Sequence, residues 1–527
     1  IFKANPIVIE KLKEHKKLLS NGELLHSYPH SWRSKAPLVH RATPQWFISM
    51  ESHKLRDKAL KAIDDTTFYP SKGKERLKSM IETRPDWCVS RQRVWGVPLP
   101  IFVNKETKEI LVDDEVNETI ASIYEKEGSD CWFSDDPQRF LGSKYKSEDY
   151  DKLSDIVEVW FDSGSTHSFV LEKREDLKWP ASMYLEGSDQ HRGWFHSSLL
   201  ESCGTRGRAP FESILSHGFV VDGKGLKMSK SLGNIIAPED ILKKYGADIL
   251  RIWVASSNYS EDLRIDYSIL DQHAESYRKI RNTFRYLLGN LNDNFKKIDF
   301  QKIHTTELPE LEQFMLHKLY SLDVNFKKYF KNYDFHNLYK ELLNFCTVDL
   351  SAFYFDIRKD SLYCDPVESK KRKSTILLLN IILNSLLKWF APILSFTTEE
   401  IYRLLFKDKK SIHLEKFLDF PNSFLNEKLN QKWIELIKIR NICNISIEKK
   451  RANKEIGSSL EANLNIHLDQ KLEEITKNID FSELCITSKA KIFFKKNLET
   501  SAQTTKAKGT KCPICWKISE DSCPRHP

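Results

Sequence analysis

The chain has 527 residues, of which 30% are charged and 40% hydrophobic, with a formal net charge of +8. This length allows three or four domains, the composition is ordinary for a soluble globular protein, and the modest charge permits nucleic-acid binding without demanding it. Most of the 10 cysteines are scattered singly, which excludes a disulfide framework and indicates a reducing compartment, the cytoplasm.

The N-terminal residues suggest a start inside a longer protein. Residue 1 is Ile rather than Met, no charged-then-apolar signal sequence follows, and we expect an N-terminal part to be absent. Residues 1 to about 20 predict a short lysine-rich helix, and residues 72–82 a basic helix. Residues 97–103 predict a strand, whereas residues 104–150 are charged and irregular and are typical of an insertion.

Two segments alternate strand, polar glycine-containing turn and helix. Residues 156–161 predict a strand ending in Asp162-Ser163-Gly164. Residues 183–185 predict another, followed by residues 186–195 and a helix to about Cys203. This order is typical of an open parallel α/β sheet, in which ligands bind beyond the carboxyl ends of the strands.

The turn after the second strand carries side chains that could hold a small zwitterion. Glu186 or Asp189 would bind an ammonium group, Gln190 a polar edge, and Trp194 an apolar side chain. The alternative is a capped helix start with Asp189 as its N-terminal anion. Trp160 likewise is either core filler or one wall of an apolar pocket.

The stretch 223–234 places two lysines and two serines between glycines, after a strand-like segment. We expect a mobile loop, because glycine lets the backbone bend and approach a ligand closely. A helix should follow from Pro238 to about Tyr245, with Gly246 as its stop. Ammonium groups on such a loop suit a polyphosphate, although a solvated basic turn is the alternative reading.

Beyond residue 241 the pattern is that of a helical bundle. Interrupting polar residues make the apolar run 376–394 a buried helix rather than a membrane span. The charge run 370–373 predicts a solvated loop, Thr397 and Glu400 are spaced as a capping box, and residues 501–511 predict a flexible linker. The predicted helices cover residues 271–292, 311–330, 338–356, 373–390 and 429–454.

Two cysteine-containing pairs lie at the C-terminus: Cys512 with Cys515, and Cys523 with His526. Each pair has two intervening residues, and a short loop separates the pairs. This spacing suits a tetrahedral Cys3His zinc knuckle, with free thiols as the alternative.

Residues 227–231, Lys-Met-Ser-Lys-Ser, match the second signature of class I aminoacyl-tRNA synthetases. Further segments closely resemble the isoleucyl-tRNA synthetases of the bacterial type, and the similarity spans nearly the whole chain. These segments are residues 84–96, 160–165, 186–195 and 217–219, with 456–462 downstream.

The resemblance implies a fold and domain order. A Rossmann-like α/β catalytic half with a parallel sheet precedes an all-α anticodon-binding bundle and a small C-terminal zinc-binding region. The implied parts are residues 1–25 (a remnant following the editing domain), 26–240 (catalytic, with the insertion at about 104–150), 241–305 (a stem-contact junction), 306–455 (anticodon-binding) and 456–527 (tRNA-contacting, with the knuckle at 512–526).

The resemblance also assigns roles to the residues already singled out. Glu186, with Gly187, Asp189 and Gln190, would bind the aminoacyl-adenylate, and Trp160 and Trp194 would flank the isoleucine side chain. ATP would contact a second set of residues: Lys230, Lys227, Ser229, Ser231, His217 and Gly218, with the two lysines as the catalytic residues.

The implied activity is isoleucine–tRNA ligation in two steps. The isoleucine carboxylate attacks the α-phosphorus of Mg²⁺-bound ATP, and the terminal ribose of tRNA(Ile) then takes the acyl group. Positioning and cationic stabilisation supply the rate, so no general base is required. We expect a monomer with no membrane partner and a structural zinc ion.

Two departures keep other functions open. The family's His-x-Gly-His motif does not occur in this sequence, and Ser31 and Ser34 stand where some relatives carry zinc-binding cysteines, so no metal is expected there. The missing His-x-Gly-His motif keeps open a non-catalytic tRNA-binding protein derived from a synthetase. Within the enzyme class, a valine- or leucine-specific relative is a separate alternative.

We expect these 527 residues alone neither to edit mischarged products nor to activate isoleucine efficiently, because half of the implied ATP site is missing from them. Isoleucine-dependent ATP–pyrophosphate exchange by the isolated chain tests this. Exchange at a rate normal for a complete synthetase would contradict the expectation.

Overall fold

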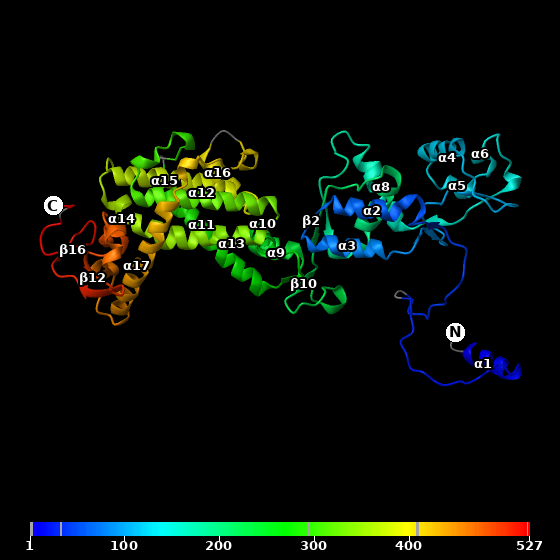
Figure 1. Cartoon of the computed structure of the whole chain (residues 1–527), viewed down its shortest axis with the longest axis horizontal. Helices are drawn as coiled ribbons and strands as arrows, with labels where there is room; N and C mark the ends of the chain where they lie inside the picture. The colour runs from blue at the N-terminus through cyan, green and yellow to red at the C-terminus, as the bar shows by residue number, and fades with distance from the viewer. Residues whose placement is uncertain are drawn as a thin grey trace. The chain divides into compact units, whose positions relative to one another are not determined.

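The computed structural model describes residues 4–31, 34–292, 295–296, 298–406, 410–523 and 525–526. The chain divides into two compact units, Ile1–Leu215 and Ser216–Pro527. Each unit has its own elements and is coloured by residue number in Figure 1.

The first unit is an α/β unit with short strands. Its helices are α1 (Ala4–Glu14), α2 (Leu55–Asp64), α3 (Lys72–Glu82), α4 (Asp114–Glu127), α5 (Cys131–Ser134), α6 (Gln138–Leu141), α7 (Val159–Gly164) and α8 (Trp194–Arg206). Its strands are β1 (Phe47–Ile48), β2 (Thr67–Tyr69), β3 (Trp87–Cys88), β4 (Ser90–Arg91), β5 (Phe102–Asn104), β6 (Tyr150–Lys152), β7 (Ile156–Val157), β8 (Tyr184–Gly187) and β9 (Ser213–His217), whose last two residues belong to the second unit.

A three-stranded sheet in the order β2-β9-β8 forms the centre of this unit. Strands β2 and β9 are parallel, with Phe68 opposite Ile214, as expected for an α/β sheet. Helices α2 and α3 each bury residues four apart, Ala59 with Ile63 and Leu77 with Ile81, since this spacing brings side chains to one face. Helix α8 is buried continuously from residue 195 to 203, which explains why its sequence shows no separate polar and apolar faces.

Two strand predictions in this unit were wrong. The segment 97–103 forms a strand only from Phe102, because Pro98 and Pro100 lack the N–H that a strand ladder requires. The segment 156–161 leaves the sheet after Val157, and the N–H of Phe161 then donates to the carbonyl of Glu158 at 2.9 Å, closing the first turn of α7.

The segment 104–150, expected to be irregular, instead forms helices around its own small core. Helices α4, α5 and α6 lie together in Figure 1. They enclose Trp132 and Phe140, both 0% exposed, together with Phe102 and Val116. A few apolar residues at helical spacing sufficed to order a strongly charged segment.

The second unit is mainly helical. Its helices are α9 (Pro238–Tyr245), α10 (Ala247–Ser256), α11 (Tyr267–Leu291), α12 (Glu310–Lys331), α13 (Phe335–Asn344), α14 (Asp356–Cys364), α15 (Lys370–Phe390), α16 (Ser395–Leu405), α17 (Glu427–Ala452), α18 (Glu473–Thr476) and α19 (Phe481–Leu484). Its strands are β10 (Val220–Asp222), β11 (Leu263–Ile265), β12 (Ala462–Asp469), β13 (Lys489–Lys495), β14 (Ser501–Lys506), β15 (Thr510–Lys511) and β16 (Ile518–Ser519).

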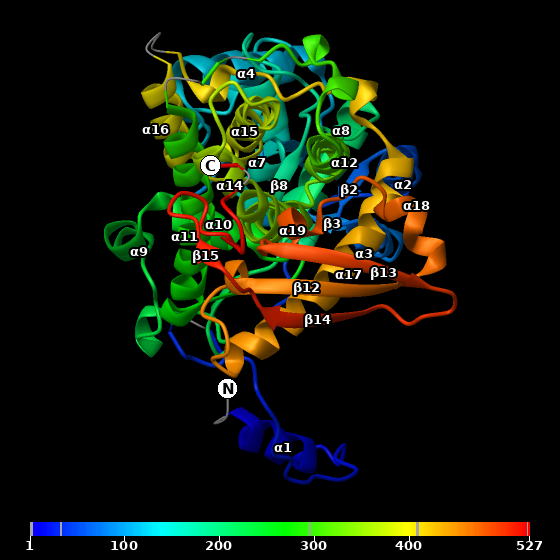
Figure 2. The ribbon, with the colours of Figure 1, turned by 90° about the vertical axis from the view of Figure 1, so that its left-hand side faces the viewer.

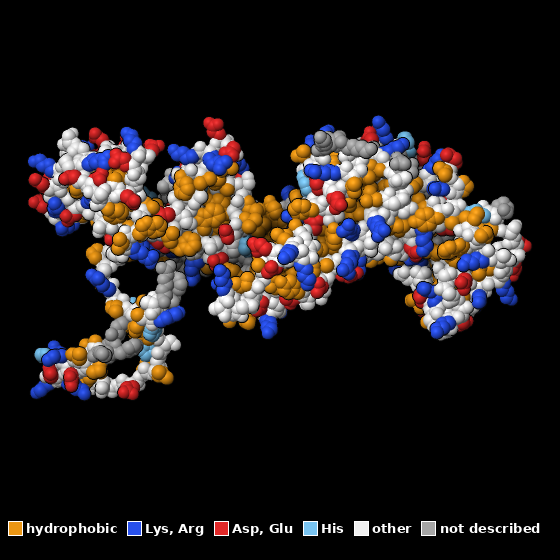
Figure 3. Space-filling view, turned by 180° about the vertical axis from the view of Figure 1, so that it is seen from behind, with side chains coloured by type: hydrophobic (Ala, Val, Ile, Leu, Met, Phe, Trp, Pro, Cys, Tyr) orange, Lys and Arg blue, Asp and Glu red, His pale blue; other side chains and the backbone are white. Residues whose placement is uncertain are grey.

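Helix α15 is the buried centre of the bundle, as its apolar pattern predicted. Trp389 and Phe390 are fully buried, and the indole N–H of Trp389 donates to Asp323 at 3.0 Å. Among the described residues, no helix is both long and apolar enough to cross a membrane. On the face drawn in Figure 3, Lys and Arg side chains are interspersed with Asp and Glu, with hydrophobic side chains between them.

The helix after the lysine-bearing loop has the predicted bounds, Pro238–Tyr245, and Gly246 follows it with a φ of 86°. The predicted helix 338–356 is instead two α-helices, α13 and α14, joined by a π-helical segment, Phe345–Phe355. Strands β10 and β11 pair in parallel, and helices α9 and α10 connect them along the chain.

Three further sequence predictions in this unit were wrong. The charge run 370–373 is the first turn of α15, where Lys371 pairs with Glu483 at 2.8 Å. Thr397 caps no helix, because its hydroxyl donates to Asp248 at 2.6 Å inside the fold. The segment 501–511 is not a linker, since it contains β14 and β15.

A three-stranded sheet near the C-terminus has the order β13-β12-β14, and Figure 2 shows its strands side by side. Strand β12 is parallel to β13 and antiparallel to β14. Alternate residues of β12 are buried, among them Leu464, Ile466 and Leu468, so one face of the sheet packs on the unit's core.

A buried ion-pair network connects the bundle to this sheet region. Arg358 of α14 donates to both carboxylate oxygens of Glu312 of α12, at 2.6 and 2.7 Å, and to Glu483 of α19 at 2.7 Å. The hydroxyl of Tyr354 also donates to Glu312 at 3.0 Å. Glu312 is 0% and Arg358 4% exposed, so both charges depend on each other for compensation.

Replacing Glu312 with Ala should lower the free energy of unfolding by about 3–5 kcal/mol, because a buried guanidinium then loses its main partner. Denaturant unfolding followed by tryptophan fluorescence measures the change. As a control, Glu275→Ala removes an exposed ion pair with Arg278 and should have little effect. Equal effects of the two substitutions would contradict the importance of the buried network.

Candidate functional site

The first candidate site lies in the first unit, where β8 ends and α8 begins. Glu186 is exposed at the end of β8, and its carboxylate accepts the N–H of Gly187 at 3.2 Å. Gln190 donates to the Asp189 carboxylate at 3.1 Å and accepts the N–H of Trp194 at 3.0 Å. The polar residues singled out in this turn are therefore tied to one another and to its backbone.

The indole of Trp194 is held rigidly at the start of α8. It stacks on Tyr184 with ring centroids 4.0 Å apart and planes inclined by 4°, and its N–H donates to the carbonyl of Ser163 at 3.0 Å. The residue is half-buried, so one part remains available to a ligand. An aromatic side chain fixed in this way makes a preformed apolar wall.

Trp160 reaches the same place from α7, although the sequence placed it at a strand end. A Cβ atom on Gly193 would lie 2.5 Å from Oε1 of Gln190 and 2.9 Å from Cη2 of Trp160, so both side chains press against this glycine. Trp160 is 39% exposed. The fold thus brings Trp160, Gln190 and Trp194 together around a residue that has no side chain.

The second candidate site is the loop 223–234, which belongs to the second unit. The side chain of Asn234 donates to Asp222 at 2.8 Å and accepts the N–H of Ser229 at 2.9 Å, which ties the two ends of the loop together. The hydroxyls of Ser229 and Ser231 lie 3.2 Å apart. Asn234 and other hydrogen bonds to Asp222 lower the pKa of the Asp222 carboxyl, keeping it ionised as an acceptor.

Lys227 and Lys230 are exposed residues of this loop. Within the described part of the chain, the ammonium group of neither lysine forms a hydrogen bond or an ion pair. Both groups are therefore free to bind an anion; that this anion is a polyphosphate stays a prediction.

His217 and Gly218 lie at the base of the same loop. The His217 ring nitrogen Nδ1 lies 2.8 Å from the Gly218 carbonyl. A Cβ atom on Gly218 would lie 2.2 Å from the carbonyl oxygen of Glu261, so the backbones of these two segments pass too closely for any other residue.

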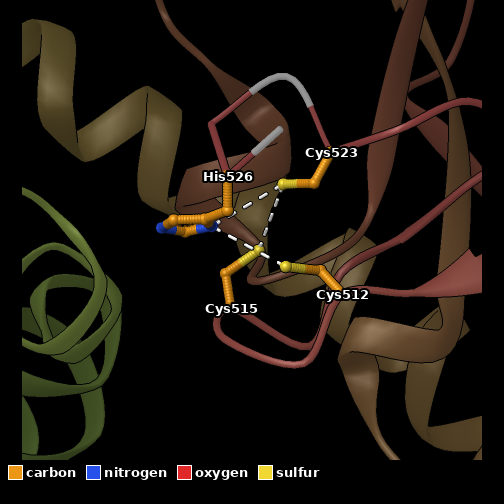
Figure 4. A group of neighbouring side chains, drawn as sticks. All are labelled: Cys512, Cys515, Cys523 and His526. Atoms are coloured by element: carbon orange, nitrogen blue, oxygen red, sulfur yellow. Dashed lines mark hydrogen bonds between the residues drawn. The ribbon is translucent and has the colours of Figure 1, made fainter.

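The third candidate site is the C-terminal cluster of Cys512, Cys515, Cys523 and His526, drawn in Figure 4. The ligand atoms of these four residues all lie within 4.8 Å of one another. Sγ of Cys515 lies 3.8 Å from Sγ of Cys523, and Nδ1 of His526 lies 3.7 Å from Sγ of both Cys512 and Cys523. Tetrahedral zinc with bonds of about 2.0–2.3 Å separates its ligands by similar distances, so the donor set fits this metal.

The surroundings of the cluster orient its ligands. Nε2 of His526 lies 2.9 Å from the Cys364 carbonyl, which leaves Nδ1 facing the sulfurs. Arg525 forms ion pairs with Asp360 and Asp365 of the segment around α14. A backbone N–H directed at its sulfur lowers the pKa of Cys512 to about 6, which favours the thiolate that binds metals.

Sequence reasoning missed the residues that hold these sites in shape. Gly193 and Tyr184 act through tight packing, and Ser163 through its carbonyl, none of which leaves a distinctive pattern in the sequence. Asp222 and Asn234 could have been found, because polar residues flanking a glycine-rich loop commonly bind its backbone. Of the segment 31–34, Trp32 and Arg33 lie outside the described residues.

Comparison with known proteins follows the same division of the chain. The family described as tRNA synthetases class I (I, L, M and V) matches residues 9–266, and the Anticodon-binding domain of tRNA ligase matches residues 312–467. The two matched ranges cover most of the first unit and most of the helical bundle.

Curated relatives match over nearly the full chain. An isoleucine–tRNA ligase from Pelagibacter ubique (strain HTCC1062) is 79% identical over 526 residues, covering 100% of this chain and 58% of the relative. One from Brucella abortus biovar 1 (strain 9-941) is 47% identical over 535 residues, covering 98% of this chain and 54% of the relative. The chain thus spans about half the length of the curated relatives it matches.

A solved structure of Mycobacterium tuberculosis methionyl-tRNA synthetase in complex with methionyl-adenylate is similar in fold, with a TM-score of 0.52 at 16% identity. The similarity covers 73% of this chain and 67% of that one. That similarity concerns the fold alone. The two family matches and the 79% identity place the chain in the class I aminoacyl-tRNA synthetase family, where it groups with the isoleucine–tRNA ligases.

Proposed function

We propose that the protein to which this chain belongs is an isoleucine–tRNA ligase, which activates L-isoleucine with ATP and transfers it to tRNA(Ile). The observation that carries the proposal is the 79% identity to an isoleucine–tRNA ligase across the whole chain. The grouping of Trp160, Gln190 and Trp194 around Gly193 supports it, because these residues could form a small pocket with one polar and one apolar side.

In this proposal the first unit binds the aminoacyl-adenylate. The exposed carboxylate of Glu186, assisted by Asp189 and the Gly187 backbone, attracts the ammonium group of the amino acid. Gln190 contributes a polar edge, and the indoles of Trp160 and Trp194 enclose the branched side chain. Burying an aliphatic side chain between two rings stabilises the complex by roughly 1.5–3 kcal/mol.

The loop of the second unit supplies positive charge to ATP. Lys230, with Lys227, stabilises the charge that develops on the phosphates when the carboxylate attacks the α-phosphorus. Ser229 and Ser231 donate from their hydroxyls, and His217 and Gly218 line the adenosine. Mg²⁺ enters bound to ATP, and the second step passes the acyl group to the terminal ribose of tRNA(Ile).

The remaining parts act on tRNA. We assign residues 306–455 to anticodon binding, 241–305 to the junction that contacts the stem, and 456–527 to a C-terminal region that contacts tRNA. Zinc held by Cys512, Cys515, Cys523 and His526 keeps that region folded and takes no part in the reaction. We further assign the enzyme to the cytoplasm, as a monomer.

Lys230→Ala in the full-length protein should lower kcat for isoleucine-dependent ATP–pyrophosphate exchange by about 10²–10³-fold, since one preorganised charge on the transition state is removed. Lys224→Ala is the matched control, because Lys224 is an exposed lysine of the same loop outside the motif. A change of less than about threefold in Lys230→Ala would rule out the proposed role. Exchange with valine or leucine but not isoleucine would reassign the substrate.

Cys512→Ser should abolish stoichiometric zinc binding, because serine is a poor zinc ligand. Metal content measured by plasma mass spectrometry should fall from about one zinc per chain to far below one. The control Cys88→Ser, which changes a thiol of the first unit, should leave the zinc content unaltered. Folded, unsubstituted protein without zinc would refute the assignment.

A further inference from the structure

A cavity of about 610 Å³ lies in the first unit, lined by residues of α3, of the segment that follows α3, and of the chain just before and at the start of α8. Three of its lining residues are arginines, Arg76, Arg84 and Arg192, and none is a carboxylate. Ser79, Thr83 and His196 add hydroxyl and imidazole groups. Such a lining offers hydrogen-bond donors and positive charge to a ligand but no negative charge.

Within the described residues, most of the positive charge in this cavity has no acidic partner, although Glu158 interacts electrostatically with Arg84. Arg76 and Arg192 are exposed, and their guanidinium groups form no ion pair or hydrogen bond to any residue that the structure describes. Nε of Arg84 is buried without an acceptor, while its guanidinium lies 5.5 Å from the centre of the Trp87 ring. Burial lowers the pKa of Arg84, which means that its charge is held there at a cost.

His196 adds a second unsatisfied group to the same cavity. The residue is only 3% exposed, and neither ring nitrogen has a hydrogen-bond partner among the described residues. Burial, reinforced by Arg84, lowers the pKa of His196 to about 3, so the ring is neutral at physiological pH. A neutral imidazole has one N–H to donate, and a buried donor without a partner is rare unless a ligand supplies one.

The cavity adjoins another of about 370 Å³ that leads to the aminoacyl site. The two share Arg84, Arg192 and His196, and the second is also lined by Trp160 and Gly193. A ligand held by the arginines could therefore extend toward the indole that we assign to the amino acid.

The carboxylates of this second cavity already have partners. Glu158 accepts the indole N–H of Trp87 at 2.7 Å and pairs with Arg91 at 3.2 Å. Asp86 accepts the backbone N–H of Met50 at 2.8 Å. These contacts leave the guanidinium groups of Arg76 and Arg192 for a ligand.

We propose that Arg76, Arg84, Arg192 and His196 form a binding pocket for a phosphate group. Guanidinium groups bind phosphate through paired N–H donors, and several of them together match a multiply charged tetrahedral anion better than a single carboxylate. The positive end of α8, which begins beside Arg192, adds to this preference.

The phosphate has two possible sources, the backbone of an RNA strand or free pyrophosphate. The lining that this cavity shares with the one containing Trp160 favours RNA, because a strand whose end accepts the amino acid must pass close to that residue. This choice of source rests on the proposed function, whereas the pocket itself does not.

Direct titrations of the full-length protein test the pocket. The double variant Arg76→Gln/Arg192→Gln should bind a single-stranded RNA with the sequence of the tRNA(Ile) 3′ end about 10–100-fold more weakly, because hydrogen bonds between charged groups are removed. The slope of log K against log salt should shrink by about 0.7 for each phosphate that the protein no longer neutralises. Both residues are exposed, so circular dichroism should show an intact fold.

Arg174→Gln, which changes an exposed arginine paired with Asp176, is the control and should bind RNA as the unsubstituted protein does. Weaker pyrophosphate binding with unchanged RNA binding would support the pocket and assign it to free phosphates. The proposal is overturned if neither probe binds the double variant more than about threefold more weakly, or if Arg174→Gln weakens binding as much. Absence of isoleucine activation in the unsubstituted protein would instead contradict the proposed function and leave these titrations valid.

Discussion

The ion pair between Arg358 and Glu312 is the interaction on which the second unit depends. It joins α12 to α14 away from water, and the guanidinium of Arg358 also reaches Glu483 beside the terminal sheet. A buried charge pair is stable only when its geometry satisfies nearly all donors and acceptors, so these segments must meet in one arrangement. Helix α14 continues this role through Asp360, which pairs with Arg525 next to the cysteine cluster.

The pocket that we propose for the aminoacyl group depends on a different constraint, the absence of a side chain at Gly193. Trp160 and Gln190 occupy the space that a Cβ atom would fill, while Tyr184 fixes the indole of Trp194 by stacking. A pocket assembled by packing in this way is preformed, so little conformational entropy is given up when a small ligand binds.

Charged side chains are arranged differently in the helical bundle than in the lysine loop and the arginine-lined cavity. In the bundle, buried charges are paired with one another, as in Arg358 with Glu312. In the lysine loop and in the arginine-lined cavity, Lys227, Lys230, Arg76 and Arg192 form no ion pair with any residue that the structure describes. Unpaired cations that the fold holds close together are typical of surfaces that bind phosphate.

The sequence alone determined the features that depend on neighbouring residues. These include the helix Pro238–Tyr245 with its stop at Gly246, the buried helix α15, the family resemblance, and the spacing of the four C-terminal residues that cluster. Each follows from a local pattern of polarity, glycine or cysteine, which the chain carries wherever it folds.

Only the tertiary structure decided the rest. Trp160, expected at a strand end, lies instead in helix α7, where its indole packs against Gly193. Thr397, expected to cap a helix, instead forms a buried hydrogen bond with Asp248. The tertiary structure also brought Arg76 and Arg192 to one cavity from distant parts of the sequence. These outcomes depend on contacts between remote segments, whose energies no local pattern of residues encodes.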